Sequence, residues 1–134
     1  LAGINSLNLN EYISEIFSTD KIIPSAGQGV IALQCKSDDL LIKNILKKIN
    51  DEKTFNGAQA ERNVLKVLEG DCETAVGAIS MINSKNITLE AELFSLDGKE
   101  RFYCKSSKDI KYAAELGIEV GENLKKQSKG SYKK

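Results

Sequence analysis

The sequence predicts an α+β fold in which a three-stranded antiparallel sheet is covered by helices. Segments 75–82, 87–93 and 101–104 have the composition of strands, and in the second of them apolar and polar residues alternate. The pair Asp97-Gly98 is a hairpin signal before the last strand. The chain of 134 residues is 41% hydrophobic and 28% charged, which is typical of a globular domain.

The N-terminal part of the chain is predicted to contain two helices and one strand. The spacing of apolar residues predicts a short helix over 7–17 and an amphipathic helix over 39–49. Between them, a connection that holds the only proline, Pro24, leads into an apolar run over 30–35. This run has the pattern of a largely buried strand.

One helix is predicted before the three strands in the sequence and another after them. Thr54 can cap a helix that ends at Gly70, and a further capped helix is expected from about 107 to 125. Lysines are frequent from 125 to 134, and this end is expected to be a solvated tail. The helix after Thr54 is expected to bury one side, made of Phe55, Ala58, Val64, Leu65 and Leu68.

Charge and residue usage exclude several classes of function. Nineteen Lys and Arg residues balance nineteen Asp and Glu residues, so no net positive charge favours nucleic-acid binding. The chain has no histidine and therefore no imidazole for acid–base chemistry or for a His-based metal site. No apolar run reaches the roughly 20 residues of a membrane span. Cys35, Cys72 and Cys104 are far apart, which argues against a zinc site or disulfide framework and favours a reducing cytoplasm.

The glycines at 27 and 29 belong to a stretch, 27–32, that fits the pattern GxGxx(G/A) of dinucleotide-binding proteins. That site requires a strand before the glycines and a helix after them, whereas here a strand is expected to follow. A backbone hinge between packed units is the favoured interpretation. Contact of exposed backbone amides with a ligand is the intermediate possibility.

Cys72 is predicted to lie in a loop just after a helix, between Asp71 and Glu73. Negative neighbours and a helix C-terminus both disfavour a thiolate, which argues against a thiol protease or a redox switch. From the residues alone, Cys72 is most simply a small apolar side chain without a chemical role. Cys35 and Cys104 fall at apolar positions of predicted strands, where this interpretation is stronger still.

Three groups of residues, in this order, resemble porphobilinogen deaminase, also called hydroxymethylbilane synthase. The first is Ile23-Pro24-Ser25-Ala26-Gly27-Gln28-Gly29-Val30 leading into Leu33-Gln34-Cys35-Lys36, and the second combines Ala60-Glu61-Arg62-Asn63 with Leu68-Glu69-Gly70-Asp71-Cys72. The third is Leu96-Asp97-Gly98. The resemblance covers nearly the whole chain.

The resemblance implies a division of the chain into three parts of a longer, three-domain enzyme. Residues 1–27 would close the second domain and form the hinge. Residues 28–50 would return, as a strand and a helix, to the first domain, so that this segment belongs to an incomplete α/β domain. Residues 51–134 would form the C-terminal domain that carries the cofactor.

The resemblance also implies a chemical role for the loop cysteine. In the family, the cysteine that matches Cys72 carries a dipyrromethane cofactor through a thioether, and the growing pyrrole chain is built on it. The enzyme joins four porphobilinogen units to hydroxymethylbilane with release of ammonia, in tetrapyrrole (haem) biosynthesis. Gln28 and Gly29 match the hinge beside the cofactor, where their amides would contact substrate carboxylates. No catalytic residue and no metal ligand is expected in this segment, which alone would be inactive.

The expected partners follow from the same resemblance. They are porphobilinogen and the N-terminal domains of the same enzyme, which would be a cytoplasmic monomer without nucleic-acid or membrane partners. Residues 1–50 would expose apolar faces made for those domains. The alternative is a stand-alone α+β binding or regulatory module without a covalent cofactor, in which Cys72 has no chemical role.

Overall fold

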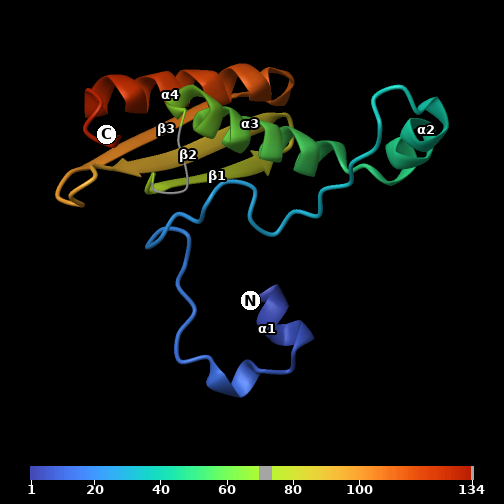
Figure 1. Cartoon of the computed structure of the whole chain (residues 1–134), viewed down its shortest axis with the longest axis horizontal. Coiled ribbons are helices and arrows are strands. Elements are labelled where there is room, and N and C mark those ends of the chain that lie inside the picture. The colour runs from blue at the N-terminus through green and yellow to red at the C-terminus, as the bar shows by residue number, and fades with distance from the viewer. Residues whose placement is uncertain (70–73, 134) are drawn as a thin grey trace.

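The structure is a computed structural model that describes residues 1–69 and 74–133. Its centre is an antiparallel sheet with the strand order β1-β2-β3, in which consecutive strands are neighbours. Helices α3 and α4 lie side by side on one face of this sheet (Figure 1). The predicted fold class, a three-stranded antiparallel sheet covered by helices, is therefore confirmed.

The elements follow one another along the chain with two short 3-10 helices among them. They are α1 (Ala2–Ser6), η1 (Asn10–Tyr12), α2 (Leu40–Ile49), α3 (Glu52–Leu68), β1 (Val76–Asn83), β2 (Asn86–Phe94), β3 (Arg101–Asp109), η2 (Ile110–Tyr112) and α4 (Ala113–Ser128). None of the helices within the described ranges is long and apolar enough to cross a membrane.

The central strand β2 shows the alternation that the sequence predicts. Its residues Ile87, Leu89, Ala91 and Leu93 are fully buried against the helices. The hairpin at Asp97-Gly98 also forms, and Gly98 has the positive φ of 69° that this turn requires. The predicted sheet is correct because each of its signals is local in the sequence.

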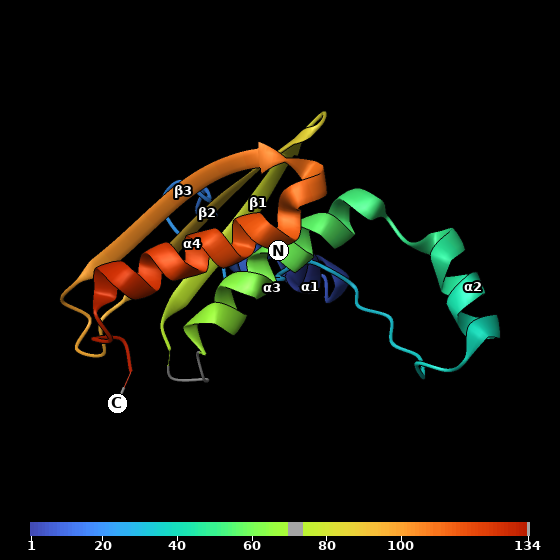
Figure 2. The same ribbon diagram turned by 90° about the horizontal axis from the view of Figure 1, so that it is seen from above.

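Helices α3 and α4 approach each other so closely that two glycines are needed between them (Figure 2). A Cβ atom on Gly121 would lie 2.8 Å from Cβ of Val67. One on Gly117 would lie 2.8 Å from Cβ of Asn63 and closer still to the carbonyl oxygen of Ala60. The backbones of the two helices are thus in direct contact at these points.

Helix α3 differs in two ways from its prediction. It begins at Glu52, because the side chain of Asp51 accepts the backbone N–H of Thr54 at 2.7 Å and caps the helix. Phe55, predicted to be buried, is 53% exposed, because the sheet lies against another side of the helix. The buried residues of α3 are Gly57, Ala60, Glu61, Val64 and Leu68.

Helix α4 begins later than predicted, because β3 is longer than its apolar residues indicate. Residues 107–109 continue the ladder with β2, where the hydroxyls of Thr88 and Ser107 lie 2.7 Å apart. The side chain of Asp109 then accepts the backbone N–H of Lys111 and starts η2. A polar cross-strand pair extends a strand that the sequence ends at Cys104.

The lysine-rich C-terminal end is not a solvated tail. Tyr132 is 1% exposed and is among the largest fully buried side chains of the described residues. The chain turns back at Lys129 and Gly130, which have φ values of 48° and 87°. One aromatic side chain therefore determines the position of a segment that is otherwise polar.

The N-terminal part of the chain departs most from prediction. The helix expected over 7–17 is absent; only α1 and η1 form in this region. The strand expected over 30–35 is also absent, because the sheet of the described residues offers these residues no partner strand. Helix α2 forms as predicted and projects away from the sheet in both views (Figures 1 and 2).

Replacing Gly117 by alanine is expected to destabilise the chain. Overpacking costs about 1–3 kcal/mol, whereas the better helix propensity of alanine returns about 1 kcal/mol. Because the added methyl group meets backbone atoms of Ala60, we expect a net loss of about 1–2 kcal/mol in the free energy of unfolding. Urea unfolding followed by circular dichroism measures this change.

Glu122→Ala, at an exposed position of α4, is the control for this experiment and should stay within about 0.5 kcal/mol of the parent chain. A Gly117→Ala variant as stable as this control would show that the close approach of the helices has no energetic role.

Candidate functional site

The candidate site residues lie in two regions, of which the structure describes one. Gln28 and Gly29 lie in the hinge, defined here as residues 25–29, and both are exposed. Cys72 lies outside the described residues. The structure describes the residues on either side of it. Before it lie Leu68 and Glu69 at the end of α3, and after it the chain leads from Thr74 into β1.

The segment before the hinge covers the free edge of β1. Ile23 is 8% exposed, and the carbonyl of Pro24 accepts the backbone N–H of Ala78 at 2.9 Å. A Cβ atom on Gly77 would lie 2.6 Å from the carbonyl oxygen of Ile23. The segment and the strand are therefore packed backbone to backbone, which leaves less of the sheet edge unpaired.

Glu61 connects the hinge to the domain. Its carboxylate accepts the backbone N–H of Gly27 at 2.8 Å, and the backbone N–H and hydroxyl of Ser80 at 2.8 and 2.7 Å. The residue is 9% exposed, so its charge is stabilised by these donors rather than by water. Three segments, the hinge, α3 and β1, meet at one side chain.

Glu61 belongs to the motif Ala60-Glu61-Arg62-Asn63, but the sequence alone predicts no role for it. The available signal was its place on the buried stripe of α3, one position after Ala60 and three before Val64. A carboxylate on such a stripe needs buried donors. Its donors come from distant parts of the chain, which no pattern within the helix reveals.

The hinge glycines have the backbone conformation expected of them. Gly27 and Gly29 have φ values of 75° and 74°, in the left-handed region that favours glycine. The amide of Gly27 is occupied by Glu61. Gln28 and Gly29 stay exposed, and their contact with a ligand remains a prediction.

A hollow of about 550 Å³ lies between the hinge and α3. It contains two cationic side chains, Arg62 and Lys66, and ends at Glu69, next to the part of the chain that leads to Cys72. Cations at this place attract carboxylates. Its lining consists of Ala26, Gly27, Arg62, Asn63, Leu65, Lys66 and Glu69.

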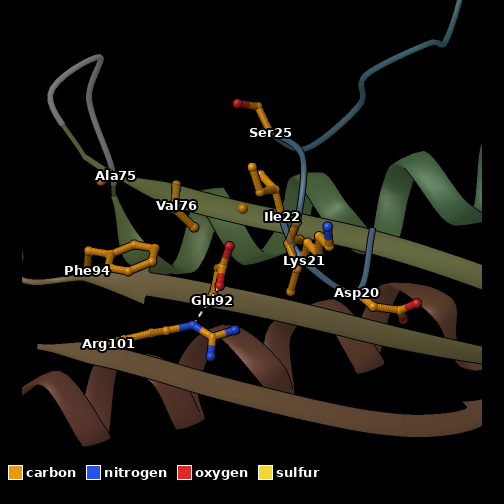
Figure 3. Close-up of a pocket in the computed structure, with 11 residues that line it drawn as sticks. Asp20, Lys21, Ile22, Ser25, Ala75, Val76, Glu92, Phe94 and Arg101 are labelled. Carbon is orange, nitrogen blue, oxygen red and sulfur yellow. Dashed lines mark hydrogen bonds and ion pairs between the residues drawn. The ribbon is translucent and has the colours of Figure 1, made fainter. Parts of the chain in front are cut away.

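A second hollow, of about 580 Å³, lies on the face of the sheet away from the helices (Figure 3). It is lined by residues of the segment 20–25 and by residues of all three strands. Inside it, Nε of Arg101 donates to the carboxylate of Glu92 at 2.8 Å. The charge of Glu92 is thus balanced within the sheet, and this hollow offers less free positive charge than the one beside α3.

Further along the same face, Glu90 accepts two short hydrogen bonds. Tyr103 Oη and Lys105 Nζ both lie 2.7 Å from its carboxylate. The bonds from Lys105 and Tyr103 lower the pKa of Glu90, and the same carboxylate raises the pKa of Tyr103 to about 12. These charges pair with one another and stabilise the sheet.

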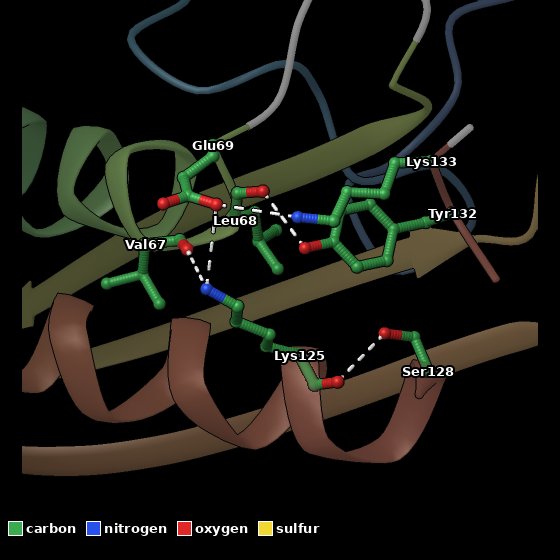
Figure 4. Close-up of polar contacts among 7 residues, drawn as sticks. All are labelled: Val67, Leu68, Glu69, Lys125, Ser128, Tyr132 and Lys133. Atoms are coloured by element: carbon green, nitrogen blue, oxygen red, sulfur yellow. Dashed lines mark hydrogen bonds and ion pairs between the residues drawn. The ribbon is translucent and has the colours of Figure 1, made fainter. Parts of the chain in front are cut away.

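The end of α3 is held by the C-terminal residues (Figure 4). The carbonyl oxygen of Leu68 accepts the hydroxyl of Tyr132 at 3.0 Å, and that of Val67 accepts Nζ of Lys125 at 3.3 Å. The carboxylate of Glu69 lies 3.4 Å from Nζ of Lys133. These contacts were missed because the terminal lysines indicate a solvated tail.

The other two cysteines show no activating environment. Cys35 is half-buried in the connection before α2, and Cys104 is half-buried in β3. Burial raises the pKa of the Cys104 thiol. Among residues 1–69 and 74–133, no three Cys, Asp or Glu side chains converge as metal ligands would.

The fold and the candidate site define an α+β domain, with two helices on a three-stranded antiparallel sheet, whose free edge is covered by a preceding hinge segment. The chain belongs to the porphobilinogen deaminase family. Residues 55–126 match the family model "Porphobilinogen deaminase, C-terminal domain", and residues 1–44 match "Porphobilinogen deaminase, dipyromethane cofactor binding domain". The resemblance inferred from the sequence motifs is thereby confirmed.

Individual relatives agree with the family models. The chain is 37% identical over 123 residues to the porphobilinogen deaminase of Desulforamulus reducens and 32% identical over 126 residues to that of Prochlorococcus marinus. These matches cover 92% and 94% of this chain and 40% of each relative. The chain thus spans about 40% of the length of the curated relatives it matches.

Replacing Glu61 by alanine is expected to release the hinge from the domain. It removes three charge-assisted hydrogen bonds and leaves the N–H groups of Gly27 and Ser80 without this acceptor, so we expect a loss of about 3 kcal/mol. Limited proteolysis should cut faster within residues 25–29. Unfolding in urea and mass mapping of the cleavage sites measure the two effects.

Glu61→Gln keeps one amide oxygen as an acceptor and should lose less stability than Glu61→Ala. Glu52→Ala, at an exposed position of the same helix, should leave the cleavage rate unchanged. Equal cleavage rates in all three variants would contradict the role assigned to Glu61.

The Tyr103–Glu90 pair is expected to make the free energy of unfolding fall as the pH rises above 10. Because the pKa of Tyr103 is about 12 in the folded chain and 10.0 ordinarily, the unfolded state releases this proton first. The contribution of the pair is therefore fully present below pH 10 and is lost as the pH rises towards 12. Urea unfolding at pH 9, 10 and 11 measures the free energy of unfolding. It should fall less with pH in Tyr103→Phe than in the parent chain.

Tyr112→Phe is the matched control, since Tyr112 contacts only Lys111 through its ring among the interactions described for it. It should show the same fall as the parent chain. A parallel fall in the parent and in Tyr103→Phe would show that the hydrogen bond to Glu90 does not contribute.

Proposed function

We propose that the chain is the C-terminal part of a hydroxymethylbilane synthase. This transferase would join four porphobilinogen units to hydroxymethylbilane with release of ammonia, in tetrapyrrole biosynthesis. The observation that carries the proposal is the pair of family matches, which follow each other along the chain in residues 1–44 and 55–126. The sequence Leu68-Glu69-Gly70-Asp71-Cys72 supplies the cysteine that the cofactor requires.

Cys72 is proposed as the attachment point of a dipyrromethane cofactor. Its sulfur would form a thioether bond to a pyrrole methylene carbon, and the aminomethyl nitrogen that held this carbon would leave as ammonia with the thiol proton. The cofactor, when bound, supplies the pyrrole end on which further units are added. A carbon so easily attacked does not require a thiol with a lowered pKa.

The chemistry of the hollow beside α3 fits this group. Pyrrole units of this class carry acetate and propionate side chains, and Arg62 and Lys66 place positive charge next to the end of α3. Gln28 and Gly29 are exposed on the neighbouring hinge, and we propose that their backbone amides contact the same carboxylates as secondary cofactor-binding residues.

We propose that the catalytic residues, including the general acid or base of the polymerisation, are in the part of the enzyme that precedes this segment, as the family resemblance implies. The chain has no histidine, and the strongly paired carboxylates Glu61, Glu90 and Glu92 are already occupied by neighbouring donors. The 134 residues alone would be inactive.

The domain division inferred from the sequence is part of the proposal. Residues 1–27 would close the second domain and form the hinge, residues 28–50 would belong to the first, and 51–134 would form the C-terminal domain. The support is the exposure of large apolar side chains in the first two parts, which the rest of the enzyme would cover. They are Leu1, Ile4, Leu7, Leu9, Tyr12, Ile16, Phe17, Ile22, Val30, Ile31, Leu33, Leu40, Leu41, Ile42, Ile45 and Ile49.

The proposed partners are porphobilinogen and the N-terminal domains of the same enzyme. The equal numbers of basic and acidic residues give no support to a nucleic-acid partner. The complete enzyme is proposed to be a cytoplasmic monomer.

Intact-mass measurement with peptide mapping tests the proposal on the protein as its own cells make it. We expect a dipyrromethane-sized addition on the peptide that contains Cys72. Cys72→Ser should lack the addition, because serine does not form the thioether, whereas Cys104→Ser should keep it.

An unmodified Cys72 in the native protein would contradict the proposal. The chain would then be better described as a stand-alone α+β binding or regulatory module without a covalent cofactor. Circular dichroism of Cys72→Ser shows whether the substitution alters the fold, so that a lost addition is not confused with a misfolded chain.

A further inference from the structure

The hollow between the hinge and α3 has walls that the fold holds in place. On the hinge side, Ala26 packs against the hydrophobic core, and the N–H of Gly27 donates to the carboxylate of Glu61 at 2.8 Å. On the other side lies α3, which packs against α4 and β1. The volume of about 550 Å³ falls within the range of about 300–1,000 Å³ that is typical of small-molecule sites. The hollow therefore exists without a ligand.

Two positive charges of α3 belong to the lining of this hollow. Arg62 and Lys66 are both exposed, and they are four residues apart on the helix. Side chains at this spacing are neighbours on a helix surface, where like charges repel each other. The ion pairs of the described residues include neither of them. An anion bound between the two cations would offset this repulsion.

Glu69 adds one carboxylate to the same lining. Nζ of Lys133 and Nζ of Lys125 lie 3.4 and 3.8 Å from one of its oxygens, Oε2 (Figure 4). The hydrogen bonds and ion pairs of the described residues leave the other oxygen, Oε1, unused. Because a carboxylate accepts hydrogen bonds at both oxygens, Oε1 is available to a cationic group of a ligand.

The lining also contains two apolar side chains, Ala26 and Leu65, which are both half-buried. Sites for small molecules combine apolar surface with a few polar groups that fix the orientation of the ligand. The hollow therefore suits a small ring that carries two carboxylates and one cation.

We propose that this hollow is a binding site for free porphobilinogen, which it recognises by charge at three points. Porphobilinogen has two carboxylates, on its acetate and propionate side chains, and one cationic aminomethyl group. Arg62 and Lys66 bind the carboxylates, and Oε1 of Glu69 accepts a hydrogen bond from the aminomethyl group. The identity of the ligand rests on the proposed function, whereas the site consists only of described residues and needs no covalent bond.

Binding of porphobilinogen to the Cys72→Ser chain tests the site, because this substitution removes the thiol that would react with the ligand. An NMR titration should show saturable shifts of amide signals in α3 and the hinge. In the same background, Arg62→Ala and Lys66→Ala should each raise the Kd about tenfold, the effect of losing one charge-assisted hydrogen bond. Lys53→Ala removes an exposed cation of the same helix outside the hollow and should leave the Kd unchanged.

Glutarate, which has two carboxylates but no cationic group, separates the role of Glu69 from that of the two cations. Glu69→Gln should raise the Kd of porphobilinogen about fivefold, because it weakens the hydrogen bond to the aminomethyl group. The same variant should not raise the Kd of glutarate. Arg62→Ala should weaken the binding of both ligands.

An absence of saturable shifts in α3 would overturn the site. An equal rise of the Kd in Arg62→Ala and Lys53→Ala would also overturn it, since the ligand would then respond only to net charge. A Glu69→Gln chain that loses affinity equally for both ligands would contradict recognition of the aminomethyl group.

The proposed function fails by a different observation, which is a native protein without pyrrole on the Cys72 peptide. Porphobilinogen binding to the hollow of such a protein would support the site while the covalent role of Cys72 is lost. A native protein that carries the pyrrole but shows no binding at the hollow would overturn the site alone.

Discussion

The buried carboxylate of Glu61 is the interaction on which the arrangement of this chain depends. It accepts hydrogen bonds from the hinge at Gly27 and from β1 at Ser80 while belonging to α3. A carboxylate removed from water requires several donors, and the chain supplies them only when these three segments are together. Burial of one charge thus makes the position of the hinge depend on the folding of the domain.

The close packing of the helices explains why this interaction is possible. Gly117 and Gly121 let α4 lie directly on α3, so the neighbouring side of α3, which carries Glu61, packs against β1 and the hinge. Bulkier residues there would separate the helices and shift α3 relative to β1. The hydrogen bonds between Glu61 and Ser80 therefore depend on residues in another helix.

How well the sequence predicts each element depends on whether its causes are local. The presence of the three sheet strands, the hairpin at Gly98 and α2 is predicted correctly, because alternation, turn residues and apolar spacing act over short distances. The end of β3 is not, because a polar cross-strand pair carries it on to Asp109. The strand expected over 30–35 is wrong because a strand needs a partner, and buried Tyr132 was missed because its contact, Leu68, is distant in the sequence. For the site, the motifs identify Cys72 as a candidate, whereas the contacts of Glu61 require the fold.

The same distinction applies to the described residues on either side of the stretch that contains Cys72. Before the stretch that contains Cys72, Leu68 is held by Tyr132; after it, the carbonyl of Ala75 accepts the N–H of Phe94 at 3.0 Å. Leu68 and Ala75 are thus attached to the C-terminal residues and to β2. Both contacts join residues that are distant in the sequence, so the described residues on either side of this stretch are positioned by the fold of the helices and the sheet and not by the local sequence.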